Sequence, residues 1–336
     1  MNVEKSKYIY GLDIVRGISA ILIILYHYTT RYNESMYTAK EYITDWSVKV
    51  SWGSLAVCTF FLLSGYLSGI YKEGNTLEYL KKRFVRIWPT FIVCCTLTSV
   101  CMAMFYNQAF VGWKMTVYNF TMLPILIGGG QKVDGVYWTL QNEIIFYFVV
   151  AILYALTKSK KVKENFLITW LVIAILFHFV PMKGIIGSIL NIFLMPKYIG
   201  VFILGICTRE YVDKDVDKRN IILFILSMCT LTIWSNKLTI AFTIGSAVLI
   251  YILSMYNFKI NENTIIVQFF CFIASISYPL YLCHQMIGYA IIYHLQIIGL
   301  ESEWIIIIPI MITIILATII HYVIEVPVSK KLLELI

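Results

Sequence analysis

The chain has 336 residues, of which 60% are hydrophobic and 14% are charged. With a mean hydropathy of +0.78 it is too apolar for a soluble domain of this length, so composition predicts a polytopic membrane protein. The net charge of +8 would suggest nucleic-acid binding in a soluble protein. In a membrane protein, basic cytoplasmic loops explain the same excess of Lys and Arg, and we expect no nucleic-acid partner.

Ten stretches are long and apolar enough to cross a bilayer, which predicts an all-α integral membrane fold of about ten transmembrane helices. No repeat, low-complexity tract or linker divides them, so we expect one transmembrane domain over residues 1–336 and no additional soluble domain. The eight cysteines lie in apolar stretches without a Cys-x-x-Cys pair, so we expect buried hydrophobes, not disulfides or metal ligands. The ten stretches lie near residues 12–30, 53–71, 87–107, 136–157, 165–182, 198–211 with its apolar approach, 220–236, 238–256, 276–299 and 303–325.

The first of these stretches carries ionisable groups at its start and a histidine inside it, and such groups are costly in lipid unless they serve a function. Arg16 and His27 are eleven residues apart, about three helical turns, so both side chains leave one helix face about 16 Å apart along the axis. This pattern favours a reaction path over a lipid-facing anchor. The stretch also lacks a small-residue cleavage site, so we expect it to remain in the mature protein.

The basic loop at residues 75–88 follows the second span, and its pattern predicts an amphipathic helix on the inner membrane surface. Asn75, three residues before Glu78, resembles a helix N-cap pairing, and Pro89 predicts a break after this helix. In the span before the loop, the small pair Ser64-Gly65 is expected to allow close helix packing.

The charges of the loops alternate between the two sides of the membrane. Eighteen of the 27 Lys and Arg residues lie on the side of the N-terminus and eight on the other, with Arg16 inside a span. The positive-inside rule then predicts that both termini are cytoplasmic. The same alternation allows no crossing around residues 110–130, so we expect that apolar segment to be re-entrant or interfacial, ending at residues 128–130 beside an outer cavity.

Six short stretches, in order along residues 11–327, resemble the membrane acyltransferase-3 family. The stretches are spread over nearly the whole chain. Departures from the family pattern are mild: Val15 stands where Leu is commoner, and Tyr66 where Phe is. The stretches are Leu12-Asp13-x-x-Arg16-Gly17 continuing to His27, Phe60-Phe61-Leu62-Leu63-Ser64-Gly65-Tyr66, Arg83-Phe84-Val85-Arg86, Trp138-Thr139-Leu140-Gln141-Asn142-Glu143, Ser277-Tyr278-Pro279-Leu280-Tyr281-Leu282-x-His284, and Glu325-Val326-Pro327.

The resemblance implies about ten spans and transfer of an acyl group, usually acetyl, from coenzyme A to a hydroxyl, often on a cell-surface sugar. We therefore expect acyl-coenzyme A, acetyl-CoA in the usual case, as a co-substrate, and no permanently bound cofactor. The acceptor would be a glycan or another hydroxylated molecule. The expected location is the plasma (inner) membrane of a bacterium, and the oligomeric state is left open.

A base must remove the proton of an alcohol as it attacks a thioester, and imidazole has an ordinary pKa near the working pH. The family match makes His27 the candidate base, against the alternative of a buried histidine that only bonds a neighbouring helix. His284 is the second candidate, with a structural hydrogen bond as its alternative. His178, His294 and His321 match no motif and are expected to be structural.

Arginines are the candidate donor-binding groups. Arg83 and Arg86, one turn apart, are expected to bind the phosphates of coenzyme A, with a positive-inside anchor as the alternative. Arg16 keeps its charge in a membrane helix and needs an anion, which could be Asp13 one turn earlier, another carboxylate or a substrate phosphate.

Glu143 lies about five residues into a span, where a lone charge is expensive, so we expect it to orient a histidine or an arginine or to contact the acceptor. It follows Trp138 and Thr139, which we expect to support the site. Ser277 and Tyr281, one turn apart, are expected to donate hydrogen bonds to the substrate or to a helix end.

Three functions compete. The first is an integral membrane O-acyltransferase acting on a glycan or on a small molecule. The second is a transporter or flippase, which would also place charges on inner faces, although the inverted repeats common in transporters are not found. The third is a catalytically silent sensor or scaffold, in which Arg16, His27 and Glu143 would have no use.

Overall fold

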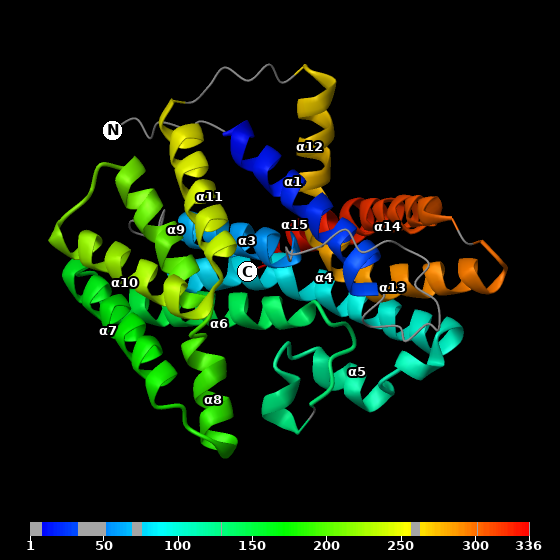
Figure 1. The fold of residues 1–336 in the computed structure, drawn as a ribbon, viewed down its shortest axis with the longest axis horizontal. Coiled ribbons are helices and arrows are strands. Elements are labelled where there is room, and N and C mark those ends of the chain that lie inside the picture. Colours follow the sequence, from blue (N-terminus) through cyan, green and yellow to red (C-terminus); the bar gives the residue numbers. More distant parts are fainter. Residues whose placement is uncertain are drawn as a thin grey trace. The chain divides into compact units, whose positions relative to one another are not determined.

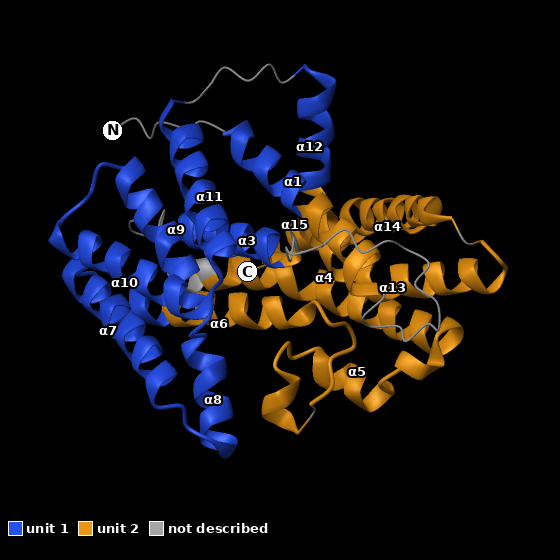
Figure 2. Ribbon diagram, in the orientation of Figure 1, with its two compact units in different colours: residues 1–19, 54–74, 152–274 blue, residues 20–53, 75–151, 275–336 orange. Residues whose placement is uncertain are grey.

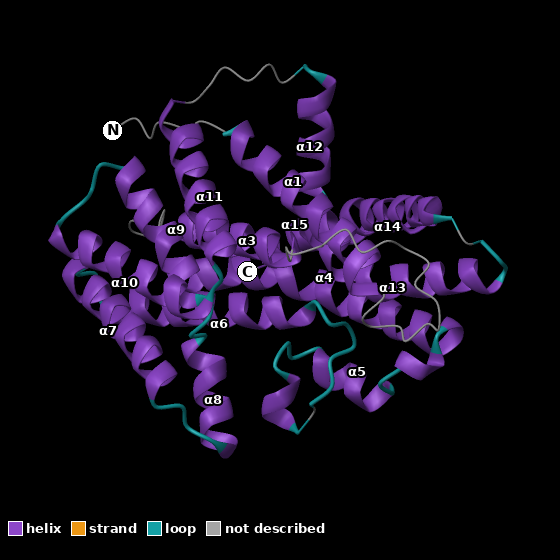
Figure 3. Cartoon of the chain, in the orientation of Figure 1, coloured by secondary structure: helices purple, strands orange, loops and turns teal. Residues whose placement is uncertain are grey.

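The structure is a computed structural model that describes residues 9–32, 52–68, 76–128, 130–256, 263–300 and 302–335. Within these ranges all regular structure is helical, and none of it is strand (Figure 3). The elements are α1 (Tyr10–Tyr26) and its π-helical continuation η1 (His27–Arg31), α3 (Trp52–Ser68), α4 (Thr76–Phe105), η2 (Asn107–Ala109), α5 (Trp113–Asn119), η3 (Pro124–Ile127), α6 (Tyr137–Leu156), α7 (Lys160–Phe179), α8 (Gly184–Leu194), α9 (Ile199–Val212), α10 (Lys218–Trp234), α11 (Lys237–Tyr256), α12 (Ile265–Ser275), α13 (Ser277–Ile297), η4 (Glu303–Ile306), α14 (Ile307–Ile320), η5 (His321–Glu325) and α15 (Val326–Leu335) (Figure 1).

A helix lies at each of the ten predicted spans, which confirms the all-α membrane fold. Among the described residues, seven helical stretches are long and apolar enough to cross a membrane, and a bent pair would make eight. That pair joins α12 to α13, and α12 was not predicted. The number of crossings stays a prediction. The seven stretches are Tyr10–Arg31, Leu80–Phe105, Tyr137–Leu156, Lys160–Phe179, Gly184–Val212, Lys237–Tyr256 and Glu303–Leu335.

The chain forms two compact units, each assembled from segments far apart in sequence (Figure 2). The first unit comprises residues 1–19, 54–74 and 152–274, and the second comprises residues 20–53, 75–151 and 275–336. The prediction of a single transmembrane domain stays a prediction.

In the first unit, α3 and α9 cross with their backbones in close contact. A Cβ atom on Gly65 would overlap the backbone oxygen of Phe202, and one on Gly205 would overlap that of Leu62. Only glycine permits this approach, because any side chain would hold the two helices apart. The interpretation of Ser64-Gly65 as a packing site is thereby confirmed.

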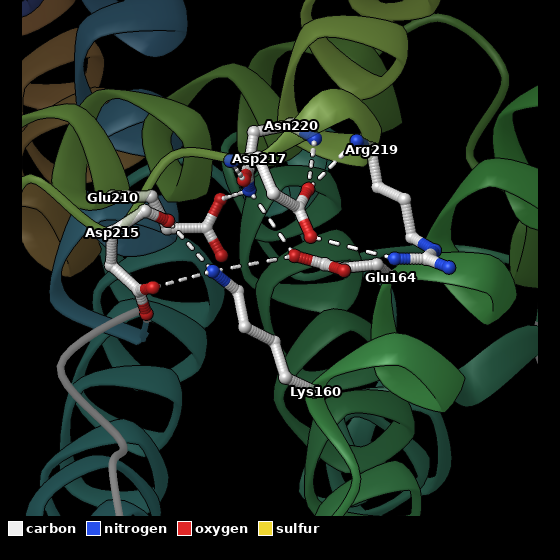
Figure 4. Close-up of polar contacts among 7 residues, drawn as sticks. All are labelled: Lys160, Glu164, Glu210, Asp215, Asp217, Arg219 and Asn220. Carbon is white, nitrogen blue, oxygen red and sulfur yellow. Dashed lines mark hydrogen bonds and ion pairs between the residues drawn. The ribbon is translucent and has the colours of Figure 1, made fainter.

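A cluster of charged residues joins the ends of α7, α9 and α10 in the same unit (Figure 4). Lys160 Nζ lies 2.9 Å from Asp215 Oδ1 and 3.6 Å from Glu164 Oε1. The buried Asn220 side chain donates to Glu164 Oε1 at 3.3 Å and also to Glu210. The cluster brings together two loops that the charge count assigns to one side of the membrane, which supports the predicted alternation within this unit.

In the second unit, α4 continues through Pro89, so the predicted break after residue 88 is wrong. Proline cannot donate a hydrogen bond to the carbonyl four residues earlier, which here belongs to Val85. The hydroxyl of Ser329, from α15, donates to Val85 O at 3.2 Å instead. The carbonyl is therefore satisfied and the helix persists. Asn75 lies outside the described residues, so its predicted capping role stays a prediction.

The segment after α4, predicted to be re-entrant or interfacial, folds back along α4. The hydroxyl oxygens of Ser99 and Thr116 are 2.8 Å apart, and Trp88 Nε1 donates to Phe120 O at 2.8 Å. Trp88 precedes Phe105, the last residue of α4, by about 25 Å of helix axis, so the chain doubles back along α4. The re-entrant or interfacial place of the segment, and the outer cavity beside it, stay predictions.

Contacts at the two ends of the second unit also agree with the charge alternation. At one end, Tyr32 donates to Gln296 Oε1 at 2.8 Å, and His294 Nε2 lies 2.7 Å from Phe105 O. The contact of Ser329 with Val85 joins two residues that the charge count assigns to the other side of the membrane. The alternation is consistent within the unit, while the side on which the termini lie stays a prediction.

Candidate active site

Two histidines predicted separately form a hydrogen-bonded pair in the second unit. His27 is the first residue of η1 and His284 lies in the middle of α13. His27 Nδ1 is 2.8 Å from His284 Nε2, and the ring centroids are 4.8 Å apart. His284 is fully buried, whereas His27 is partly exposed. His27 is therefore the less buried member of the pair.

The hydrogen bonds of His284 determine which nitrogen of each ring carries the proton. His284 Nδ1 lies 2.8 Å from Tyr281 O and 3.2 Å from Leu280 O. Because carbonyl oxygens only accept, Nδ1 must carry the hydrogen, and Nε2 of the neutral ring must accept. His27 Nδ1–H therefore donates to His284, which leaves His27 Nε2 unprotonated. A lone pair on the more exposed histidine is what a general base requires.

The backbone of His284 is held from η1. Tyr28, which is fully buried, donates its hydroxyl to His284 O at 2.7 Å. A Cβ atom on Gly288, one turn further along α13, would overlap the Tyr28 hydroxyl, so glycine is required there. Sequence reasoning missed Tyr28, because nothing in a tyrosine beside a histidine specifies a contact with another helix.

The end of the re-entrant segment and the start of α6 contact the same part of α13. The hydroxyls of Thr139 and Tyr281 are 2.7 Å apart, and Tyr137 donates to Leu282 O at 3.4 Å. The Tyr281 ring centroid lies 5.7 Å from that of His284. Thr139 and Tyr281, predicted as supporting residues, thus bond each other beside the histidine pair.

Asp134 is a buried carboxylate at this junction that sequence reasoning missed. Its Oδ1 accepts from Val136 N–H and its Oδ2 from Met286 N–H, each at 3.1 Å. Burial raises the pKa of Asp134 to about 7, although the two backbone hydrogen bonds oppose that shift. The signal available in the sequence was a lone carboxylate between an apolar re-entrant segment and a span.

Glu143 and Arg83 are linked through Tyr147. Tyr147 donates its hydroxyl to Glu143 Oε1, and the guanidinium carbon of Arg83 lies 4.6 Å from the centre of the Tyr147 ring. Glu143 thus contacts Arg83 indirectly, through Tyr147, which was not predicted. The prediction that Glu143 orients an arginine stays a prediction. Arg86 is exposed on the next turn of α4.

Helix α13 runs from the level of Ile87 on α4 to the histidine pair. Tyr278 donates to Ile87 O at 2.7 Å, and both Glu143 and Arg86 act on it electrostatically. Tyr278 and His284 are six residues apart, about 9 Å along the helix axis. The buried Ser277 begins α13, and the half-buried Trp138 lies near the start of α6.

An apolar cavity of about 430 Å³ lies between α4, α6 and the end of the re-entrant segment, and Arg83 and Tyr147 are on its wall. A flexible chain attached to an anionic group matches such a surface, because the arginine attracts the anion and the apolar wall shields the chain. Its apolar lining includes Leu80, Phe84, Trp88, Met122, Ile144 and Phe148.

Arg16 and Asp13 belong to the first unit. Arg16 NH1 lies 3.4 Å from Asp13 Oδ1, so the predicted pairing one turn apart is confirmed. A role of Arg16 in donor binding, and the path from Arg16 to His27, stay predictions.

Comparisons with known proteins identify relatives. A family described as an acyltransferase domain matches residues 9–323. The O-acetyltransferase OatA of Staphylococcus aureus strain NCTC 8325 / PS 47 is 24% identical over 383 residues, which cover 97% of this chain and 58% of OatA. OatA of strain COL matches with the same identity and coverage. The chain thus spans 58% of the length of these relatives. No solved structure matches the chain.

Proposed function

The chain belongs to the membrane acyltransferase-3 family, and we propose that it transfers an acetyl group from acetyl-coenzyme A to a hydroxyl of a cell-surface glycan. The acetyl group follows the precedent of an O-acetyltransferase among its relatives. The glycan is the acceptor that the family resemblance implies, and a small hydroxylated molecule is the alternative. We place the chain in a bacterial plasma membrane with both termini in the cytoplasm, as the loop charges predict.

The observation that carries this proposal is the His27–His284 hydrogen bond with its fixed tautomers. His27 Nε2 removes the proton of the acceptor hydroxyl while the oxygen attacks the thioester carbonyl carbon. The new C–O bond forms, the C–S bond breaks, and the sulfur of coenzyme A leaves with the electron pair. The proton on His27 then passes to that thiolate, so no covalent acyl-enzyme is needed.

His284 supports the base in two ways. Its Nε2 accepts from His27 Nδ1–H, which keeps the lone pair of His27 on Nε2. The same bond stabilises the imidazolium that forms when His27 takes up a proton, because a donor that becomes charged makes a stronger hydrogen bond. Since His284 is fully buried, it is assigned a positioning role.

Arg83 and Arg86 are assigned to the phosphates of the donor. Support comes from the apolar cavity beside Arg83 and from α13, which runs from the level of Ile87 on α4 toward His284. A pantetheine arm is long enough to cover the rise of about 9 Å between the level of Tyr278 and that of His284. Arg16 is kept as a further candidate for donor binding.

The test is transfer of label from acetyl-coenzyme A carrying a radioactive acetyl group, with purified protein in lipid nanodiscs and a bacterial glycan preparation as acceptor. The proposal expects label in the glycan with wild-type protein and none with His27→Ala. His178→Ala, which changes an exposed histidine in the first unit, is the matched control. Transport of glycan across the membrane without transfer of label would contradict the proposal.

A further inference from the structure

We propose that Asp134 is a positioning residue that aligns the His27–His284 pair by holding the turn of α13 that carries His284. This inference rests on the proposed function, because it assigns Asp134 a role in the chemistry at His27. Asp134 is 1% exposed and does not contact either imidazole in the hydrogen bonds described for it. Its influence must therefore pass through the backbone of α13.

The geometry of α13 around His284 supports this role. Met286 N–H and Leu282 O are four residues apart, the spacing of a donor and an acceptor that an α-helix pairs with each other. Here Asp134 Oδ2 accepts from Met286 N–H at 3.1 Å, and Tyr137 donates to Leu282 O at 3.4 Å. Side chains from one short segment thus bind both groups, on the two sides of His284.

Residues 134–137 also approach α13 at a third point. A Cβ atom on Gly135 would lie 2.9 Å from the side-chain amide nitrogen of Gln285, so the segment passes close to that side chain. The segment therefore binds residues 282 and 286 of α13, and the hydroxyl of Tyr28, from η1, binds the carbonyl of His284 between them. The position of the His284 ring therefore depends on how residues 134–137 pack against α13.

The protonation state of Asp134 decides whether both backbone bonds persist. An ionised carboxylate accepts both N–H groups, whereas a protonated one offers a weaker acceptor on the oxygen that carries the hydrogen. The titratable groups on which Asp134 acts electrostatically are Tyr28 from η1, Cys95 from α4 and Tyr137 from α6. All three are neutral near pH 7. With its pKa raised to about 7, Asp134 would change charge in the working range of the enzyme.

The test compares Asp134→Asn with wild type in the labelled-acetyl assay, normalised to folded protein. The asparagine amide can accept from one backbone N–H but not from both. We expect kcat to fall about ten- to a hundred-fold, because a small displacement of a catalytic group has effects of this size. The KM for acetyl-coenzyme A should stay within about two-fold, and the rise of kcat through pH 7 should be lost.

Two further variants keep the test decisive. Tyr137→Phe removes the contact with Leu282 O without changing charge, and it should lower kcat in the same direction even if Asp134→Asn folds poorly. Asp217→Asn is the matched control, since Asp217 also accepts from two backbone N–H groups but does so at the start of α10 in the first unit. It should lower the melting temperature and leave kcat per folded molecule unchanged.

The outcomes separate the two proposals. Wild-type kcat and an unchanged pH profile in both Asp134→Asn and Tyr137→Phe, with His27→Ala inactive, would overturn the role of Asp134 alone. A fall in activity that only tracks the loss of folded protein would do the same. Full activity of His27→Ala would overturn the proposed function, and this inference with it.

Discussion

His27 Nδ1 lies 2.8 Å from His284 Nε2, although the two residues are 257 positions apart in the sequence. The contact is directional, because the main-chain carbonyls beside His284 require its Nδ1 to carry the hydrogen. In the proposed mechanism His27 is the base, and His284 is the partner that keeps it in the reactive tautomer. A histidine and a carboxylate share these two roles in many hydrolases.

The first prediction concerns the base. His27→Ala should lower acetyl transfer by more than about 10²-fold, the usual contribution of a general base. The melting temperature of the purified protein in detergent should stay close to that of wild type, since His27 is partly exposed. Activity within about ten-fold of wild type would contradict this role.

The second prediction concerns the partner. His284→Ala should lower kcat less than His27→Ala does, by about 10- to 100-fold, as is usual for groups that orient a functional side chain. His284→Gln should retain more activity than His284→Ala, because its amide oxygen can still accept from His27. Initial rates with saturating acetyl-coenzyme A measure both. Equal loss in the two variants would show that the acceptor at this position does not matter.

The third prediction concerns the donor. Arg83→Ala should raise the KM for acetyl-coenzyme A and leave kcat nearly unchanged, because it removes binding that is equal in the ground and transition states. Tyr147→Phe keeps the ring under Arg83 but removes the bond to Glu143, so a smaller rise is expected. Lys82→Ala is the control, since exposed Lys82 pairs with Glu78 on α4 at 2.6 Å. A lower kcat with unaltered donor binding in Arg83→Ala would contradict the assignment.

The fourth prediction concerns topology. A cysteine introduced by Lys82→Cys should react with a membrane-impermeant maleimide only in inverted vesicles, because the charge count assigns this position to the cytoplasm. Lys237→Cys, at the exposed start of α11, should react in intact cells. The unsubstituted protein gives the background from native cysteines, of which Cys229 is exposed. Labelling of Lys82→Cys from outside would overturn the topology.

The fifth prediction concerns stability. Asn220→Leu should destabilise the first unit, because Glu164 and Glu210 would each lose a hydrogen-bond donor in a buried cluster. Each unsatisfied buried group costs about 1–3 kcal/mol. Thr232→Val, on the exposed face of the same helix, should have little effect. Thermal unfolding in detergent measures both, and equal melting temperatures would contradict the role of the cluster.

Composition and local pattern were enough to determine the class of fold. Only helices satisfy their own backbone groups inside lipid, so ten apolar stretches predict an all-α membrane protein without further information. Charge alternation predicts a re-entrant or interfacial segment, and the contacts of Thr116 and Phe120 with α4 show that the chain folds back there. These properties depend on residues close together in the sequence.

Where distant residues intervene, local pattern failed. Pro89 predicts a helix break, yet Ser329, far along the chain, supplies the missing donor and α4 continues. α12 was missed because an eleven-residue apolar helix is too short to be recognised as a span.

The candidate site also has features that local sequence predicts and features that depend on distant residues. Motif residues such as His27, His284, Arg83 and Glu143 were identified from the sequence, because residue types at family positions carry that information. Tertiary structure alone decided that the two histidines bond each other, and that Asp134 reaches the backbone of α13. A hydrogen bond depends on distance and direction in space, and neither is encoded in the spacing of residues that lie on different helices.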